Sequence, residues 1–559
     1  MNRKSNQLIR LATSLQVILL GFLLWPGMAP AQLNRGGVPS SSLFPDVQQI
    51  IPVHTLPPPD MAKVAAEDAA NPVPYRFAIH IPLALDFCAE GKWQLLPDGS
   101  EVCLLALEAP GAKALSVLFD RFRLPQGGRL FIRSADTRQV LGAFTSENNT
   151  PSGKFATQLI HGDKLILEYD QAPEVSGSAD LLVGSVAYAY RGVPEPGQTD
   201  GFGGAGPCEV NVNCVEGQNY QQEKKGVVRI QAVKGGSSFW CSGSLLNNTR
   251  MDGTPYLLTA DHCYNGGAYG DLLQWVFYFG YDGPGCENPE TPPLERALTG
   301  ATLKARAGAV ADGGSDFLLL LLNDAIPDTF DVFLNGWDRS NTPAMQGVGI
   351  HHPQGDIKKI STFTQKTTSV SWIGGFIYTH WLVKWAETVN GHGVTEGGSS
   401  GSALFDSSGL VIGQLTGGGS SCDSANLEEP DYYGKFSYSW ISNGPDSASQ
   451  LKPWLDPDNT GLEKLSGKPL AVHNMTYSES CAVFPNPTGG LFSVELSVGI
   501  PDGQYQIAIF DIRGLEVYSA LQQFTVRSCN VDIHSLPPGI YLLTVTGNPG
   551  RYVQKIVKY

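Results

Sequence analysis

Three short motifs carry the residue types best suited to chemistry. They are GGSSGS at 397–402, TADHC at 259–263 and GSDF at 314–317. A serine between glycines lets the backbone turn tightly around an exposed hydroxyl, and a histidine can take the proton of that hydroxyl. A buried aspartate can orient the histidine. We therefore expect Ser400 to be a nucleophile, His262 a general base and then acid, and Asp316 the residue that holds the imidazole tautomer.

The same motifs predict an oxyanion hole, formed by the backbone N–H groups of Gly398 and Ser400. Each motif alone has an ordinary structural explanation, as a histidine beside a cysteine, a glycine-serine loop and an aspartate that opens an apolar strand. Together, and in the chain order His, Asp, Ser, they are typical of chymotrypsin-type double β-barrels and not of subtilisins or α/β-hydrolases.

The composition indicates what kind of scaffold must position these residues. The chain has 559 residues, only 16% of them charged, and 64 glycines, which favours several domains of a β-rich exported protein. Its formal net charge of −15 argues against nucleic acid as a partner. No pattern calls for a cofactor or a metal.

The first 31 residues read as a signal peptide. Arg3 and Lys4 precede an apolar run over 11–25, and APA at 29–31 resembles a cleavage site, so the mature chain is expected to begin near Gln32. The apolar run is too short for a convincing membrane span, and we expect no transmembrane anchor.

The rest of the chain divides into four parts. We expect an N-terminal segment at 32–202, a catalytic domain at 203–460, a linker at 461–475 and a C-terminal domain at 476–559. Residues 32–74 are rich in proline and alanine and are expected to be extended or weakly ordered. Alternating runs at 114–119, 129–133 and 164–169 then predict strands of a small antiparallel sandwich, and a Gly/Pro stretch at 192–207 predicts a processing linker.

Ten cysteines in an exported chain indicate disulfides rather than zinc ligands. Their 2, 6, 2 grouping allows each to pair within its own segment. The groups are Cys88 and Cys103; then Cys208, Cys214, Cys241, Cys263, Cys286 and Cys422; then Cys481 and Cys529.

The central part resembles the lysyl endopeptidase branch of the trypsin-like serine proteases. The matching stretches are LTADHC at 258–263, SDF at 315–317, GWDR at 336–339, IHHP at 350–353, GVTE at 393–396 and GSSGS at 398–402. The resemblance implies disulfides Cys208 to Cys422, Cys214 to Cys286 and Cys241 to Cys263. It also implies that 32–202 is a propeptide that aids folding and maintains latency.

Two departures from trypsin bear on activation, which is expected to depend on removal of the N-terminal domain, and on substrate preference. Ser399 stands where trypsins carry the aspartate that accepts the new N-terminus, and Val394 where they carry the carboxylate for a basic side chain. The resemblance implies that Asp431 supplies this carboxylate and hence a preference for lysine. The alternative is that Asp431 is an ordinary loop acid. Thr416 replaces a histidine of the best-known lysyl endopeptidase.

Other residues have competing explanations. His351 and His352 are adjacent and would point oppositely on a strand, so we expect structural roles rather than a metal site. Trp372, Trp381 and Trp385 line either the substrate cleft or the core. No lysine lies between Arg191 and Cys208, so a strictly lysine-specific enzyme could not process itself there.

The C-terminal part resembles the sorting domain of the type IX secretion system. The motifs are VFPNPTG at 483–489, IAIFDIRG at 507–514 and LPPGIYLL at 536–543. The resemblance implies an Ig-like sandwich that directs outer-membrane passage. The alternative is a carbohydrate- or protein-binding sandwich.

We thus expect an all-β protein in which a chymotrypsin-like double β-barrel lies between a β-rich propeptide and an Ig-like β-sandwich. Its expected function is that of a monomeric serine endopeptidase, secreted or attached to the cell surface, with protein or peptide substrates and the type IX machinery as partners. The alternatives are a protease of the same fold with another specificity, or a catalytically silent adhesin or binding protein.

Overall fold

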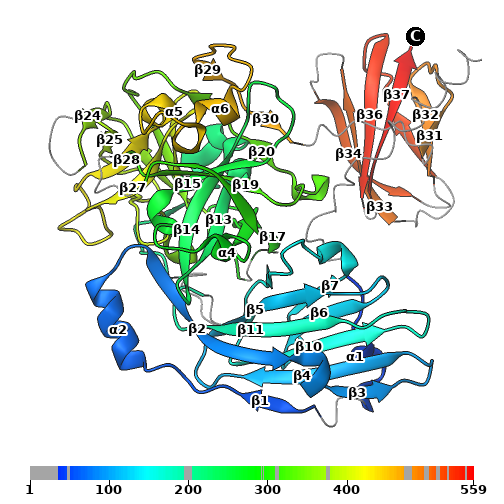
Figure 1. Ribbon diagram of the computed structural model, residues 1–559. Coiled ribbons are helices and arrows are strands. Elements are labelled where there is room, and N and C mark those ends of the chain that lie inside the picture. The colour runs from blue at the N-terminus through cyan, green and yellow to red at the C-terminus, as the bar shows by residue number, and fades with distance from the viewer. Residues whose placement is uncertain are drawn as a thin grey trace, which may run out of the picture. The chain divides into compact units, whose positions relative to one another are not determined.

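The computed structural model describes residues 36–46, 51–193, 204–290, 293, 295–308, 314–372, 378–470, 481–496, 503–511, 516–524, 528–547 and 550–559. They belong to two compact units, Met1–Leu470 and Ala471–Tyr559. Strands dominate both units, which confirms the expected all-β class (Figure 1). The expected signal peptide lies outside the described residues. Among the described helices, none combines the length and apolar character needed to cross a bilayer.

The N-terminal part of the first unit contains two β-sheets. One has the order β1-β4-β10-β6-β7 with β3 on β4, and the other contains β2-β11-β5 with β8 and β9 on β5. The strands are β1 (Val53–Thr55), β2 (Tyr75–Asp86), β3 (Lys92–Leu95), β4 (Glu101–Glu108), β5 (Ala114–Arg123), β6 (Arg129–Ser134), β7 (Val140–Phe144), β8 (Phe155–Ala156), β9 (Ile160–His161), β10 (Lys164–Gln171) and β11 (Asp180–Ala189). The three strands expected from alternating runs are confirmed as β5, β6 and β10.

Strand β5 shows why this sheet is apolar on both faces. Leu115 and Phe119 enter the core between the two N-terminal sheets, whereas Ala114 and Leu118 enter the core of the adjacent barrel. Successive side chains of a strand point to opposite faces, so one strand can serve two cores.

The lead-in at 32–74 is more ordered than expected. It contains the ten-residue helix α2 (Met61–Ala70), besides the short helix α1 (Ser40–Leu43); α3 (Phe87–Glu90) follows later. The carboxylate of Asp60 caps α2 by accepting the N–H groups of Ala62 and Lys63. The expectation was wrong because the prolines before Asp60 are followed by an alanine-rich run with high helix propensity and by the cap that Asp60 provides.

The first barrel continues the second N-terminal sheet. Its strands run in the order β17-β16-β13-β14-β15-β19-β18. They are β13 (Val227–Lys234), β14 (Ser237–Leu246), β15 (Tyr256–Ala260), β16 (Val276–Phe279), β17 (Arg296–Thr299), β18 (Ala301–Arg306) and β19 (Phe317–Leu322), with helix α4 (Tyr269–Leu272) between β15 and β16.

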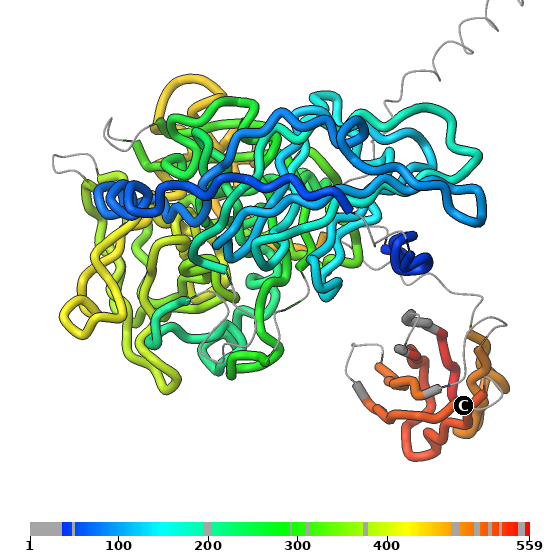
Figure 2. The backbone as a smooth tube through the Cα atoms, turned by 90° about the horizontal axis from the view of Figure 1, so that it is seen from below, coloured from blue at the N-terminus to red at the C-terminus, as the bar shows by residue number. Residues whose placement is uncertain are grey.

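Strand β2 pairs with β14, so the N-terminal sheet and the first barrel form one continuous sheet and adjoin in both views (Figures 1 and 2). The Phe77 ring stacks on Trp240 with centroids 4.1 Å apart, and both side chains are fully buried. The N-terminal segment therefore shares a hydrophobic core with the barrel that follows it in sequence.

The second barrel is a ten-stranded sheet. Its main order is β12-β23-β22-β26-β27-β28-β25-β24, with β21 on β27 and β29 on β21. The strands are β12 (Val210–Asn211), β21 (Trp337–Asp338), β22 (Gly347–His351), β23 (Lys359–Phe363), β24 (Thr368–Val370), β25 (His380–Val383), β26 (Ala403–Asp406), β27 (Val411–Gly418), β28 (Asp431–Lys435) and β29 (Lys464–Leu465). Helices α5 (Phe436–Ile441) and α6 (Lys452–Leu455) follow β28.

Two short strands lie in the stretch that the sequence assigns to a linker. Strand β29 pairs with β21, and β30 (Lys468–Pro469) pairs with β20 (Phe333–Leu334). The chain thus leaves the first unit only after Leu470.

The C-terminal unit has two sheets around one core, with orders β31-β32-β35 and β34-β33-β36-β37. This arrangement is a β-sandwich. Its strands are β31 (Cys481–Phe484), β32 (Leu491–Leu496), β33 (Gly503–Phe510), β34 (Glu516–Phe524), β35 (Ser528–Asp532), β36 (Gly539–Gly547) and β37 (Gly550–Lys558).

The disulfides are partly as expected. Cys208 is bonded to Cys422, Cys214 to Cys286 and Cys241 to Cys263, in agreement with the pairing that the resemblance implied. Each can contribute about 2–4 kcal/mol by restricting the unfolded chain.

The other four cysteines are free thiols, which corrects the expectation of five bridges. Cys481 and Cys529 lie on β31 and β35, which flank β32 on opposite sides. Two strand spacings, roughly 9–10 Å, exceed the Cα separation that a disulfide spans. Cys88 and Cys103 lie on α3 and β4, and the thiol of Cys103 is directed to the carbonyl of Phe87.

Candidate active site

His262 lies where β15 ends. The chain leaves Ala260 and enters a single 3₁₀ turn over Asp261–Cys263, and the disulfide from Cys263 to Cys241 ties that turn to β14. The imidazole is thus placed at the rim of the first barrel by a strand end and a covalent bridge.

Asp316 lies directly before β19, which pairs with β15. Its Oδ2 is 2.7 Å from Nδ1 of His262, and its Oδ1 accepts the backbone N–H of His262 at 3.0 Å. A carboxylate only accepts hydrogen bonds, so Nδ1 carries the proton and Nε2 is left as the basic nitrogen. Asp316 has a left-handed φ of +59°, and its carbonyl accepts the N–H of Asp261. A strained backbone at this point is consistent with a functional position.

A second acid beside this pair was not recognised from the sequence. Asp261 is fully buried, and both its oxygens accept hydrogen bonds from Arg306, at 2.7 and 2.8 Å. Burial raises the pKa of Asp261, and the hydrogen bonds and charge of Arg306 oppose that shift. Arg306 thus compensates a carboxylate adjacent to His262.

The Ser400 loop joins β26 to the preceding chain by a tight turn. Gly398 has a φ of +101°, and a Cβ there would lie 2.8 Å from both the amide N of Gln354 and the carbonyl O of His352. Gly401 has a φ of +82°, and a Cβ there would overlap Oγ1 of Thr259. Both glycines are therefore required by backbone conformation and by close approach.

Ser242 on β14 anchors this loop and was missed by sequence reasoning. Its N–H donates to the carbonyl of Ser400 at 2.8 Å, and its hydroxyl donates to the carbonyl of Gly398 at 2.9 Å. Within the described residues, the N–H groups of Gly398 and Ser400 themselves make no hydrogen bond. The loop therefore has its carbonyls satisfied while two amide donors stay available.

The structure places the Ser400 loop against the end of β15, the strand that precedes His262. Gly401, next to Ser400, packs against Thr259. A Cβ built on Gly401 would lie 2.5 Å from the amide N of Ala260. Among the described residues, Nε2 of His262 has no hydrogen-bond partner. In the unliganded state such a catalytic hydrogen bond is often long and forms only with substrate.

Asp431 is the first residue of β28 and is fully buried. Its Oδ2 accepts hydrogen bonds from three neutral groups, listed here with their distances: Nε1 of Trp385 at 2.6 Å, Oγ of Ser420 at 2.6 Å and Oγ1 of Thr395 at 2.7 Å. In the part of the chain that the structure describes, no cation pairs with it. Burial raises its pKa, and these hydrogen bonds oppose the shift.

The three tryptophans and Thr416 differ in their surroundings. Trp381 and Trp385 lie in the core with Val394, although Trp385 also donates to Asp431. Trp372 is half-buried against His380 and Tyr432. The hydroxyl of Thr416 is 3.0 Å from Nε2 of His380.

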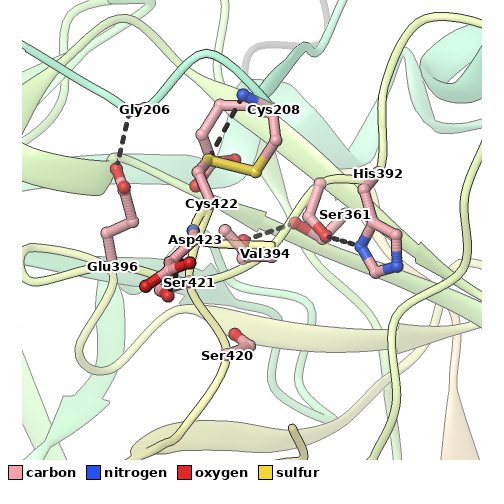
Figure 3. Close-up of a disulfide and its surroundings, with 12 residues drawn as sticks. Gly206, Cys208, Ser361, His392, Val394, Glu396, Ser420, Ser421, Cys422 and Asp423 are labelled. Carbon is pink, nitrogen blue, oxygen red and sulfur yellow. Dashed lines mark hydrogen bonds between the residues drawn. A yellow bond between two sulfur atoms is a disulfide. The ribbon is translucent and has the colours of Figure 1, made fainter. Parts of the chain in front are cut away.

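The Cys208–Cys422 bridge stands beside the stretch that precedes Ser400 (Figure 3). Near it, Glu396 accepts the N–H of Gly206 at 3.0 Å, and Ser361 donates to the carbonyl of Val394 at 2.6 Å (Figure 3). The bridge therefore links the start of the catalytic part to the segment that carries Asp431.

The chain is similar to known proteins in two regions. Residues 202–434 match the model of the lysyl endopeptidase C-terminal domain, and residues 482–559 match that of the secretion system C-terminal sorting domain. Over 373 residues the chain is 29% identical to a lysyl endopeptidase of Pseudomonas aeruginosa, an alignment that covers 63% of this chain and 76% of the relative.

Solved structures are also similar. A protease from Arthrobacter nicotinovorans is 18% identical, with 38% of this chain and 91% of that chain covered and a TM-score of 0.28. A thermostable serine protease from an extremophilic microorganism is 15% identical, with 38% and 92% covered and a TM-score of 0.27.

Proposed function

We propose that this chain, a lysyl endopeptidase-like serine endopeptidase with a C-terminal sorting domain, cleaves peptide bonds after lysine through an acyl-enzyme on Ser400. The observation that carries the proposal is the pairing of Asp316 with Nδ1 of His262, beside a loop whose amide donors are unbonded among the described residues. Such an arrangement is what acyl transfer requires.

In the proposed reaction, Oγ of Ser400 attacks the substrate carbonyl carbon while Nε2 of His262 takes the hydroxyl proton. Asp316 stabilises the imidazolium that forms, and the N–H groups of Gly398 and Ser400 bind the oxyanion. His262 then gives the proton to the leaving amine as the peptide bond breaks. Water attacks the acyl-enzyme by the same route and releases the acid product.

Lysine preference rests on Asp431. A fully buried carboxylate held by neutral donors is unpaired, and a substrate ammonium would supply the missing charge. An apolar side chain would leave the carboxylate unpaired, and its binding would be disfavoured.

The test is a profile of cleavage sites in a denatured protein digest. Wild type is expected to cut after lysine, Asp431→Asn to lose that preference, and Ser400→Ala to cut nothing. Asp423→Asn is the matched control, because Asp423 is an exposed acid of the same loop. Unchanged lysine preference in Asp431→Asn would overturn the specificity, and full activity of Ser400→Ala would overturn the mechanism. A wild type that neither cuts nor reacts with a fluorophosphonate probe would support the silent-adhesin alternative.

We further propose that 32–202 is a propeptide removed on activation. The Tyr75 ring supports latency, because a Cβ on Gly397 would lie 2.7 Å from Cδ2 of that ring, three residues before Ser400. Arg191 is held by Asp68 at 3.1 Å and stacks 4.4 Å from the centroid of Tyr75. N-terminal sequencing of wild type and Ser400→Ala tests the route: different N-termini indicate self-processing, and identical N-termini exclude it.

The C-terminal domain marks the chain as a secreted or cell-surface protein. We propose that the sorting domain is removed or used for attachment after outer-membrane passage, and that the enzyme acts as a monomer. Loss of export on truncation after Leu470 would support the sorting role, and normal export would contradict it. Sedimentation of the processed enzyme tests the monomer.

A further inference from the structure

His351 lies between the nucleophile loop and the wall of the second barrel. It ends β22 and is fully buried. Its Nδ1 is 2.8 Å from Oγ of Ser399, the residue before the nucleophile, and its Nε2 is 3.0 Å from Oγ of Ser361 on β23. The ring thus connects two strands and a loop that are distant in sequence.

The direction of each proton in this chain of hydrogen bonds follows from its far end. The carbonyl of Val394 can only accept, so Ser361 donates its single hydroxyl proton there, at 2.6 Å (Figure 3). Ser361 must then accept from Nε2–H of His351. Nδ1 is consequently unprotonated and accepts the hydroxyl proton of Ser399.

The proton direction at the Ser399 end of this chain of hydrogen bonds follows in the same way. Oγ of Ser399 accepts the N–H of Glu396 at 3.2 Å, which leaves its proton for His351. All hydrogen bonds therefore run in one direction, from Glu396 through Ser399, His351 and Ser361 to Val394. Chains of this kind strengthen one another in a low-dielectric interior.

The groups around the ring favour its neutral form. Burial lowers the pKa of His351 to about 3, and the nearby charge of Lys359 acts in the same direction. The buried carboxyl of Glu209 lies 3.9 Å from Nε2, and burial and the charge of Glu396 raise its pKa, which disfavours a negative charge beside the ring.

We propose that His351 is a positioning residue that, as a neutral imidazole, holds the nucleophile loop in the conformation that points the Gly398 and Ser400 amides at the oxyanion. This inference rests on the proposed function. Serine at position 399 fits this role because Nδ1 of the neutral ring is an acceptor and the serine hydroxyl can donate to it. A carboxylate at this position could not donate and would need a cation as its partner.

Because this chain of hydrogen bonds ends on Val394, it also links the loop to the apolar core that contains Val394 and Trp385. Trp385 in turn donates a hydrogen bond to Asp431. His351 acts through Ser399 on two backbone donors and does not itself contact the reacting atoms. A displacement of such donors by about 1 Å typically costs about 100-fold in rate.

The test uses the processed enzyme and counts active sites by burst titration, so that misfolded molecules drop out. Ser399→Ala and His351→Leu are expected to lower kcat per titrated site about 10- to 100-fold with little change in KM. The affinity for a peptide aldehyde, whose hemiacetal oxygen occupies the oxyanion hole, should fall by the same factor. His351→Asn, which keeps an acceptor near the position of Nδ1, should recover part of the loss.

His352→Leu is the matched control. His352 is equally buried, but its ring bonds the carbonyl of Asp356 instead of the loop. This variant is expected to lose stability while kcat per titrated site stays near that of wild type.

A double-mutant cycle keeps the proposal testable if His351 variants fail to fold. Ser361→Ala should lower kcat. The double variant with Ser399→Ala should have a kcat only slightly lower than that of either single variant, because both substitutions break the same chain of hydrogen bonds. Fully additive losses, or unchanged kcat and aldehyde affinity in Ser399→Ala, would overturn the proposal. A wild type without a titratable burst would instead overturn the proposed function.

Discussion

Two fully buried aspartates, one beside each barrel, are treated in opposite ways. Asp316 accepts two N–H groups of His262, so its partner belongs to the chain. Asp431 accepts only neutral donors from Trp385, Thr395 and Ser420. The proposed catalytic acid thus has its hydrogen-bond partner before substrate arrives, whereas the proposed specificity acid is stabilised by hydrogen bonds but has no counter-ion among the described residues.

This difference has an energetic meaning. Burying a charge without a counter-ion is costly, and hydrogen bonds from neutral groups recover only part of that cost. Burial accordingly raises the pKa of Asp431. In the proposed function, a substrate cation would remove the energetic cost that burial still imposes on the Asp431 carboxylate.

The largest effect is expected from Asp316→Asn. An amide in place of the carboxylate can donate towards Nδ1 and stabilise the wrong tautomer, so kcat should fall about 10⁴-fold on every substrate. Steady-state kinetics with lysine and uncharged ester substrates measure this loss. Asp261→Asn is the control, since that acid pairs with Arg306, and its kcat should be far less affected. An equal loss in both variants would contradict the assignment.

Asp431→Asn is expected to act on one substrate class alone. For a lysine ester kcat/KM should fall about 10²- to 10³-fold, whereas for the norleucine ester, which has the same chain without the charge, it should not fall. The comparison of the two esters directly measures how much the positive charge of the substrate side chain contributes to kcat/KM. Parallel losses on both esters would show that the variant disturbs the triad instead.

The pH dependence should separate the two acids. Lysine binding needs ionised Asp431, and a raised pKa means that this form is lost at a higher pH than for an ordinary aspartate, as pH falls. The ratio of kcat/KM for lysine over norleucine esters should therefore decline on acidification. Any effect common to both esters cancels in the ratio. A ratio that is flat in wild type, or that still declines in Asp431→Asn, would refute the prediction.

The smallest effect concerns stability. A carboxyl whose folded pKa is raised binds its proton more tightly in the folded state, so ionisation at neutral pH destabilises the fold. Asp431→Asn should therefore unfold at higher urea than wild type at pH 7, with the difference shrinking as pH falls. Asp431→Ala should be less stable than either, because each buried donor left unpaired costs about 1–3 kcal/mol.

The local motifs supplied most of the candidate site residues, and the structure pairs two of them, Asp316 and His262. Glycines around Ser400 and the aspartate before an apolar strand are short-range signals whose meaning depends on a few neighbouring residues. The central disulfides followed from the family resemblance. Alternation also located β5, β6 and β10, since period-two burial is a local property.

Contacts between distant segments were not predictable in the same way. Ser242, Arg306 and His351 act on residues far away in sequence, and none has a motif of its own. The free thiols of Cys481 and Cys529 depend on the strand that separates them, and α2 depends on a cap that proline-rich flanks obscured.

By itself, the order of residues determined which groups can do chemistry here and in which class of β fold they belong, because side-chain type and short spacing are properties of the chain. Only the tertiary structure decided that Asp316 pairs with His262, that Asp431 meets neutral donors but no cation among the described residues, and that His351 reaches Ser399. Pairing, burial and proton direction arise between segments that meet only after folding, and they set the energy of each charge.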